Sequence, residues 1–213
     1  MAQITSLFTS AWALVREHKR AFVLLNLAYY GLIVVFMGVA ALRPALQDEL
    51  LRATDKELTN GPLAVVSDAY TNAKVFKAIA LTFVVNLLIG SAAWITLPSM
   101  LIPFLGILLG MYRAIMWGLL FYPGHPDLQI TMIPHSLTLI VEGQAYVLAM
   151  LAAWVQGRAF LFPKSVGIEG HWQGYIEGLK RTGRIYFVVG IVLLIAAVYE
   201  VFEVILVAKL KGT

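Results

Sequence analysis

The fold is decided by residues 78–121, which read AIALTFVVNLLIGSAAWITLPSMLIPFLGILLGMYRAIMWGLLF and contain a single charge, that of Arg113. A helix needs roughly 20 residues to cross the hydrocarbon core of a bilayer, and this stretch is about twice as long. Pro98 and Ser99 in its middle predict a tight turn between two membrane spans. The alternative is one kinked helix of about 45 residues, which is much too long for a single crossing.

The composition of the chain points to the same class. The 213 residues are 60% hydrophobic and 13% charged, whereas soluble domains are about 45–50% apolar and about 25% charged. The absence of cysteine excludes disulfides, thiolate metal sites and cysteine nucleophiles. The net charge of +4 comes from basic residues between apolar runs, so we do not expect a nucleic-acid partner.

We therefore expect an all-α, multi-pass transmembrane helical bundle that forms one integral membrane domain. It has about five spans, together with interfacial amphipathic helices. The predicted spans cover residues 21–42, 78–97, 100–121, 136–156 and 187–208. The first span is too long for the apolar core of a signal peptide and lacks a small-residue cleavage site, so we expect it to be retained.

Lysine and arginine predict the orientation, because short cytoplasmic loops are enriched in them. They gather in the N-terminal tail and in the segment 158–186, which lie on one side in a five-span arrangement. The loop 122–135 has none, and the loop 43–77 balances its bases with acids. We expect a protein of the cytoplasmic membrane with its N-terminus in the cytoplasm, its C-terminus outside, and 43–77 as an extracytoplasmic loop.

Three segments mix apolar and charged residues in the manner of helices that lie in the headgroup region. They are residues 4–19, 44–58 and 171–186. Membrane-surface anchoring accounts for all three. For the last one, in the cytoplasmic segment, a docking surface for a cytoplasmic partner is the other interpretation.

Ionisable residues inside the apolar runs predict a polar cluster. On helices that rise roughly 1.5 Å per residue, Arg113, Glu142 and Glu200 each lie about 20 Å from the cytoplasmic edge of a core roughly 30 Å thick. Asn86 and Glu203 fall close to the same level. Charges at this depth normally pair or line a cavity, so we expect Arg113 to contact both Glu142 and Glu200. One base then leaves a surplus carboxyl, which is protonated or meets a cation.

This cluster has two interpretations. A static network of polar side chains holds membrane helices together. A transport or proton-coupled function would use the same residues as a path or a proton site. No GxSxG, HExxH or P-loop motif occurs, so we expect neither an enzyme nor a cofactor.

Small residues repeat every four positions along the third span, at Gly106, Gly110, Ala114 and Gly118. Such a stripe lets another helix approach closely. Because the fourth span, residues 136–156, also carries small residues along one side, we expect these two spans to pack together.

The outer loop is flanked by His125 and by the pair Pro134-His135. A metal site is conceivable there, with Asp127 as a third ligand. The spacing fits no standard zinc pattern, so we favour interfacial histidines and expect no metal.

Several short features follow one another between residues 70 and 205. They are Asn72 before a helix, Gly90 in a span, Gly106 with Gly110, Pro134-His135, Glu142 with Ala145, Ala149, Ala152 and Gly157, and Ala197-Val198-Tyr199-Glu200-Val201-Phe202. This ordered set resembles the stage II sporulation protein M family of polytopic membrane proteins. Leu105 and Ser136 stand where that family has Asn and Gly, and Glu142 comes about one helical turn later than the family's Glu.

The resemblance implies about five spans and no catalytic motif. The best-known members act in a membrane complex with peptidoglycan-degrading partners during spore engulfment, while others occur where no spores form. It therefore implies a non-enzymatic scaffold or subunit of a cell-envelope membrane complex. Besides the lipid bilayer, its expected partners are other membrane or envelope proteins, with a cytoplasmic ATPase and a second copy of the chain as further candidates.

The alternative function is a small transporter, channel or lipid-handling protein that uses the intramembrane carboxylates. This alternative predicts a water-accessible cavity that reaches Glu142 or Glu200.

Overall fold

The computed structural model of the protein describes residues 2–61, 64–71, 74–126 and 128–211. Throughout these ranges the chain forms helices joined by short turns, and it contains no strand. The predicted all-α class is therefore confirmed.

Four helices in the described part of the chain are long and apolar enough to cross a membrane, and a further apolar helix is shorter. The long ones are α2 (Lys19–Leu42), the continuous helix Val75–Leu101, α8 (Gln129–Leu161) and residues His171–Val207 of α9 (His171–Lys211), and the shorter one is α7 (Leu105–Leu120). These helices fall on the five predicted spans. The chain is an integral membrane protein.

The remaining elements are short. The helix Val75–Leu101 consists of α5 (Val75–Val84), the π-helix η1 (Val85–Thr96) and α6 (Leu97–Leu101). Outside the spans lie α1 (Ala2–Glu17), α3 (Pro44–Asn60), α4 (Ala64–Thr71) and the 3₁₀ turn η2 (Pro163–Val166). Helices α1 and α3 coincide with two of the three segments predicted as amphipathic helices.

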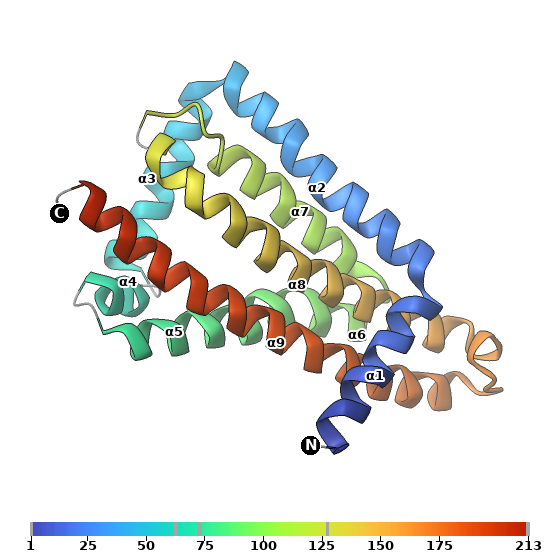
Figure 1. The fold of residues 1–213 in the computed structure, drawn as a ribbon. Coiled ribbons are helices and arrows are strands. Elements are labelled where there is room, and N and C mark those ends of the chain that lie inside the picture. The colour runs from blue at the N-terminus through green and yellow to red at the C-terminus, as the bar shows by residue number, and fades with distance from the viewer. Residues whose placement is uncertain (1, 62–63, 72–73, 127, 212–213) are drawn as a thin grey trace.

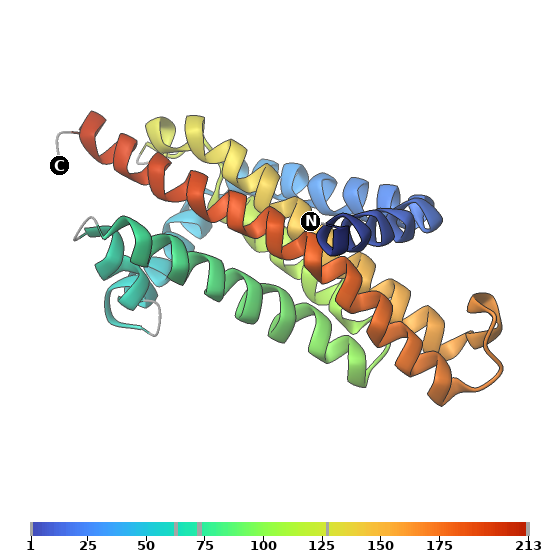
Figure 2. The same ribbon diagram turned by 60° about the horizontal axis from the view of Figure 1, so that its bottom comes forward.

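Helix α8 lies at the centre of the bundle. Helix α9 packs beside it in the opposite direction, α2 and α7 cover another side, and α5 and η1 pack against α9 and α8 (Figures 1 and 2). Within the most apolar 18 residues of each helix, 78% of the residues are buried in α8, against 17% in α2 and 33% in the described part of α9. The core is therefore built around α8, while α2 turns most of its apolar surface outward.

The turn between the second and third apolar helices is not at Pro98 and Ser99, where the sequence predicted it. Both residues lie inside α6, and the chain turns at residues 102–104. Pro98 lies where the π-helix η1 passes into α6 within this continuous helix, so the proline interrupts the backbone hydrogen bonds there without ending the helix. Ile102 precedes Pro103 and is extended (φ −123°, ψ 105°), because the proline ring disfavours a helical conformation in the residue before it.

Side chains from both sides hold this turn. Phe104 has a φ of 69°, a left-handed conformation that residues with a side chain rarely adopt. Its ring lies 5.3 Å from that of Trp154 and covers Gly157 of α8. On the other side, the Gly106 N–H donates a 2.7 Å hydrogen bond to Ser99 Oγ, which supplies a partner at the start of α7.

Helices α8 and α9 are longer than one crossing requires. They have 33 and 41 residues, which correspond to about 50 Å and about 60 Å at 1.5 Å per residue. The hydrocarbon core is only roughly 30 Å thick. The two helices therefore extend beyond it as a hairpin, which projects from the rest of the bundle (Figure 1).

The segment 171–186, which was expected to form an amphipathic helix in the headgroup region, is continuous with the fifth span. The segment is the first part of α9 and packs along the end of α8. The physical reason is a close approach of the two backbones. Gly174 lies against the backbone of Ala159, and Gly178 lies against that of Gln156.

The small residues of α7 contact more than one neighbouring helix. Gly106 faces the backbone carbonyl of Ile95 in η1, Gly110 faces the Met150 side chain in α8, and Gly118 faces the backbone of α2. Helix α7 therefore contacts α8 as expected, but the stripe also lets it fit between two other helices.

Gly106→Ala should destabilise the protein by about 1–3 kcal/mol, the usual range for overpacking. The added Cβ would overlap the carbonyl of Ile95, a backbone group that cannot move away without a shift of η1. The free energy of unfolding in mild detergent measures this loss. Gly38→Ala in α2 is the matched control, because a Cβ at Gly38 meets nothing within 4 Å. Equal effects of the two substitutions would contradict the close packing of α7 on η1.

Candidate functional site

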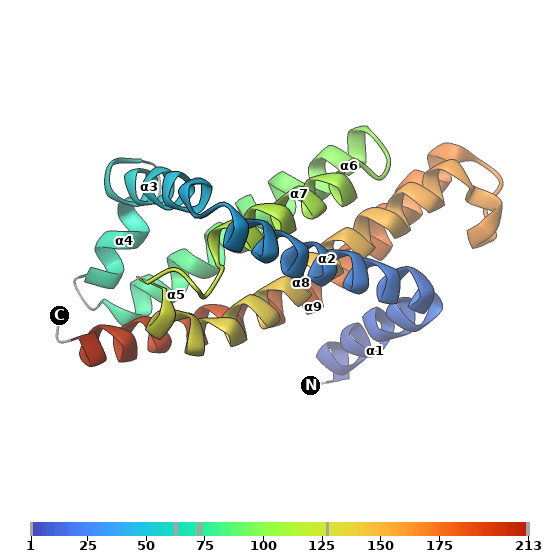
Figure 3. The same cartoon turned by 90° about the horizontal axis from the view of Figure 1, so that it is seen from above.

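A cavity of about 270 Å³ lies among the membrane helices and is lined in part by Leu58 of α3. Figure 3 shows α3 and α4 at this end of the bundle. Helices α3, α5, η1, α7, α8 and α9 all contribute to its wall. Its lining residues are Leu58, Thr82, Val85, Asn86, Arg113, Trp117, Phe121, His135, Leu139, Glu142 and Glu200. Ionisable groups from three membrane helices thus meet in one apolar-walled cavity.

Arg113 projects from the middle of α7 and is held from several directions. Its Nη2 donates a 2.7 Å hydrogen bond to the Tyr146 hydroxyl and lies 3.6 Å from Glu142 Oε1. The guanidinium also stacks on the ring of Tyr146 at 4.1 Å and approaches that of Trp117 at 5.4 Å, so both rings stabilise its charge. Its buried Nε–H has no hydrogen-bond acceptor among the described residues.

Tyr146 joins the members of this first group. Its hydroxyl donates to Glu142 Oε1 one helical turn earlier on α8, and it lies 3.1 Å from Asn86 Oδ1. The Glu142 side chain is 8% exposed and that of Arg113 is 24% exposed, so the acid is enclosed while the base reaches the cavity. Three helices are linked by four side chains.

A second pair connects α8 to α9. His135 Nδ1 lies 2.8 Å from Glu203 Oε1, and the Thr138 hydroxyl donates to Glu203 Oε2. The Glu203 side chain is only 1% exposed, and the ring of Phe121 lies 5.0 Å from that of His135. Glu203 is therefore satisfied by His135 and Thr138.

Glu200 lines the same cavity, but no cation among the described residues lies within ion-pair distance of it. The Tyr70 hydroxyl of α4 lies near it and is hydrogen-bonded to Thr82 at 2.8 Å. Burial, and then the nearby Glu200, raise the pKa of Tyr70 above its ordinary value. Tyr70 therefore keeps its proton at neutral pH.

The predicted cluster is thus formed in part. Asn86, Arg113 and Glu142 come together as expected, with Glu200 on the wall of the same cavity. The expected contact between Arg113 and Glu200 is absent from the described residues, because α9 packs on α8 and α5 and turns Glu200 toward α4. Glu203 belongs to a separate pair.

The loop residues have different places. His125 Nε2 lies 2.9 Å from Asp48 Oδ1 of α3. Pro134 lies inside α8, where its carbonyl accepts a 3.1 Å hydrogen bond from the Tyr199 hydroxyl of α9. In the ranges that the structure describes, no three histidine, aspartate or glutamate side chains are grouped as metal ligands. Asp127 and Asn72 fall outside those ranges.

Sequence reasoning missed two tyrosines and misplaced one histidine. Tyr146 follows Glu142 by four residues, a spacing that puts two side chains on one helical face, so that spacing could have found it. His135 was assigned to the membrane interface, and it pairs with Glu203 inside the bundle. Tyr70 gave no signal, because its contact with Glu200 depends on how α4 packs against α9.

In comparisons with known proteins, no family model, no curated protein and no solved structure matches this chain. The resemblance to the stage II sporulation protein M family therefore stays a prediction.

Arg113→Leu should reduce the free energy of unfolding by about 3–5 kcal/mol, because it leaves the enclosed Glu142 without its cation. The double variant Arg113→Leu, Glu142→Leu should lose less than the sum of the single losses. Chemical unfolding in mild detergent gives the coupling energy, which for contacting residues is about 0.5–3 kcal/mol. Arg113→Leu with Glu200→Leu is the control pair and should be nearly additive. A larger coupling to Glu200 than to Glu142 would contradict the observed pairing.

Proposed function

We propose that this membrane protein acts without catalysis as a small transporter, channel or lipid-handling protein that binds a small cationic or protonated group at Glu200. The single observation that supports this function is that Glu200, on the wall of an intramembrane cavity, has no cation partner among the residues that the structure describes. The sequence predicted a cavity that reaches Glu142 or Glu200 for a transporter, and no such cavity was predicted for a scaffold.

The balance of charge around the cavity favours a cationic ligand. The Arg113 guanidinium is matched by Glu142, and His135 is matched by Glu203. Glu200 remains, and a charge at this depth is normally paired or part of a path. A proton or a small cation bound at Glu200 would balance the remaining negative charge.

The size and chemistry of the wall limit what this ligand is. The volume of about 270 Å³ lies just below the range of roughly 300–1,000 Å³ that is typical of small-molecule sites. Glu200 lines it together with the paired Arg113 and Glu142, and with Trp117 and Phe121, whose ring faces attract cations. A proton, a monovalent cation or a small ammonium group fits this wall.

The backbone of η1, beside the cavity, has a conformation that can change locally. Residues Val85–Thr96 form a π-helix of 12 residues, and single π-turns are frequent at functional sites. Asn86 stands at its beginning, and Ser91 Oγ donates a 3.0 Å hydrogen bond to the Asn86 carbonyl. A wider turn of this kind provides a place where the wall can open without unfolding the helix.

A scaffold or subunit of a cell-envelope complex is the second candidate function. It is favoured by the hairpin of α8 and α9, which extends beyond the length that a bilayer needs. Near its tip the side chains of Phe162 and Trp172 are 60% and 70% exposed. Large apolar side chains at this end offer a surface for a partner protein or for the membrane interface.

Glu200→Gln should reduce the flux of a monovalent cation or of protons into liposomes that contain the purified protein by roughly ten- to hundredfold. The carboxylate contributes a charged interaction of about 1.5–3 kcal/mol, which the amide lacks. Glu200→Asp should retain part of the flux, and Glu169→Gln in the turn before α9 is the control for the loss of one acid. If the unaltered protein gives no flux of protons, monovalent cations or small ammonium ions under an imposed gradient, the transport function is wrong.

The scaffold function makes a separate prediction. Pull-down of the full chain from mild detergent should recover a stoichiometric membrane or envelope partner, and the double change Phe162→Ser, Trp172→Ser should release it. The exposed apolar pair Val34→Ser, Val35→Ser on α2 is the control, because it removes apolar surface away from the hairpin. A protein that is always isolated as a lone monomer, or a partner that neither change affects, would contradict docking at the hairpin.

A further inference from the structure

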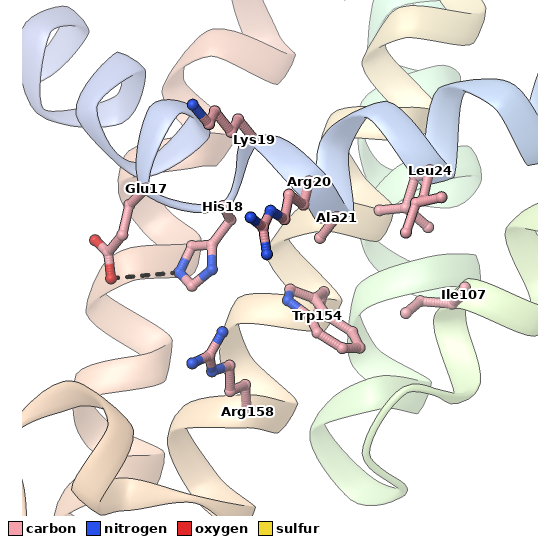
Figure 4. A pocket seen from close by; sticks show the side chains of 10 residues that line it. Glu17, His18, Lys19, Arg20, Ala21, Leu24, Ile107, Trp154 and Arg158 are labelled. Carbon is pink, nitrogen blue, oxygen red and sulfur yellow. Dashed lines mark ion pairs between the residues drawn. The ribbon is translucent and has the colours of Figure 1, made fainter.

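A second cavity of about 660 Å³ lies at the other end of the bundle, where α1 meets α2 beside α7 and α8 (Figure 4). Its lining residues are Glu17, His18, Lys19, Arg20, Ala21, Leu24, Leu25, Ile107, Trp154 and Arg158. We call it the basic pocket. It shares no residue with the cavity around Glu200.

Positive charge dominates the rim of the basic pocket. Figure 4 shows the guanidinium groups of Arg20 and Arg158 directed toward His18, from α2 and from the end of α8. The one acid of the rim, Glu17, is already paired with Arg181 at 3.2 Å. Arg158 Nε donates a 3.3 Å hydrogen bond to Ser165, but no acid of the described residues forms an ion pair with Arg20 or Arg158.

Two polar atoms in the pocket wall have no hydrogen-bond partner among the described residues. They are His18 Nε2 and Trp154 Nε1. His18 is only 6% exposed, and its closest charged neighbour is the Glu17 carboxylate at 3.6 Å. Buried polar atoms are almost always satisfied, and an indole nitrogen can only donate, so the missing partner of Trp154 is a hydrogen-bond acceptor.

The His18 ring adds no positive charge to the pocket at neutral pH. Burial lowers the pKa of His18 below its ordinary value, against the opposing effect of Glu17, and Arg158 and Arg181 lower it further. The ring is therefore neutral at pH 7 and carries one N–H. Figure 4 shows that the Nε2 side of the His18 ring is directed toward Glu17, so the indole N–H of Trp154 is the donor without a partner that lies on the side of Arg20.

The floor of the pocket is apolar and continues onto the outside of the bundle. Leu25 and Ile107 line it from α2 and α7, and Leu24 beside them is 65% exposed. A groove of about 470 Å³ adjoins it, lined by Lys19, Arg20, Val23 and Leu24. Polar donors at the rim thus pass directly into an apolar surface that α2 turns outward.

We propose that the basic pocket binds the phosphate group of an anionic membrane phospholipid. Arg20 and Arg158 contact the phosphate, the indole N–H of Trp154 donates to one of its oxygens, and the acyl chains lie along Val23 and Leu24. Basic pockets between membrane helices bind anionic headgroups in this way. The apolar groove favours a lipid over free phosphate, because a soluble anion would make no use of it.

The test measures binding of phosphatidylglycerol to the full-length protein in neutral detergent, by native mass spectrometry, with phosphatidylcholine as the neutral lipid. One phosphatidylglycerol per chain should bind in preference to phosphatidylcholine. The double variant Arg20→Gln, Arg158→Gln should weaken this binding by roughly thirtyfold, since each basic residue near an anionic headgroup contributes about tenfold or less. Lys180→Gln, Arg184→Gln is the matched control: it removes the same charge from exposed positions of α9 and should change binding less than about threefold.

A second variant distinguishes the loss of a binding contact from a general loss of structure. Trp154→Phe keeps an aromatic ring and removes only the N–H donor, so it should weaken binding by about three- to tenfold with an unchanged unfolding midpoint. Equal weakening by both double variants would overturn the proposal, because the attraction would then be unspecific. Equal binding of phosphatidylcholine would overturn it as well. Competition by inorganic phosphate at concentrations comparable to those of phosphatidylglycerol would overturn the assignment to a lipid.

Discussion

Water is missing from the hydrocarbon core, so a charge placed there has to find its partners within the chain or in what the chain binds. In this protein that constraint falls on α8. Its residues Glu142 and Tyr146 meet Arg113 of α7 and Asn86 of η1, and its His135 meets Glu203 of α9. The helix that carries the most polar contacts is also the most buried one, and the other helices are arranged around it.

Composition and apolar length predicted the fold class, because both are local properties of the sequence. The position of the first turn was not predictable in the same way, since Pro98 and Pro103 look alike in sequence and only the residue before Pro103 leaves the helix. Within the site, rise per residue correctly predicted that Arg113 and Glu142 lie at one level. It gives no direction around the helix axis, and for that reason Glu200 was placed beside Arg113.

The cavity at Glu200 and the basic pocket have opposite chemistry. Among the described residues, Glu200 has no cation within ion-pair distance, and Arg20 and Arg158 of the basic pocket have no acid within that distance. Helices α7 and α8 contribute to both, at opposite ends of the bundle. A cationic ligand at one end and an anionic headgroup at the other would each fill what the protein's own side chains leave open.

The central position of α8 also has a consequence for how the chain is assembled during its synthesis. Its most apolar window has a mean hydropathy of 1.5, the lowest of the four long helices, and it contains Glu142. Alone in lipid, α8 would therefore be the least stable of them. Its most extensive neighbour, α9, follows it in the chain and is made later. Before α9 is synthesised, α2 and α7 are therefore the helices that can pack against α8 and cover its polar side chains.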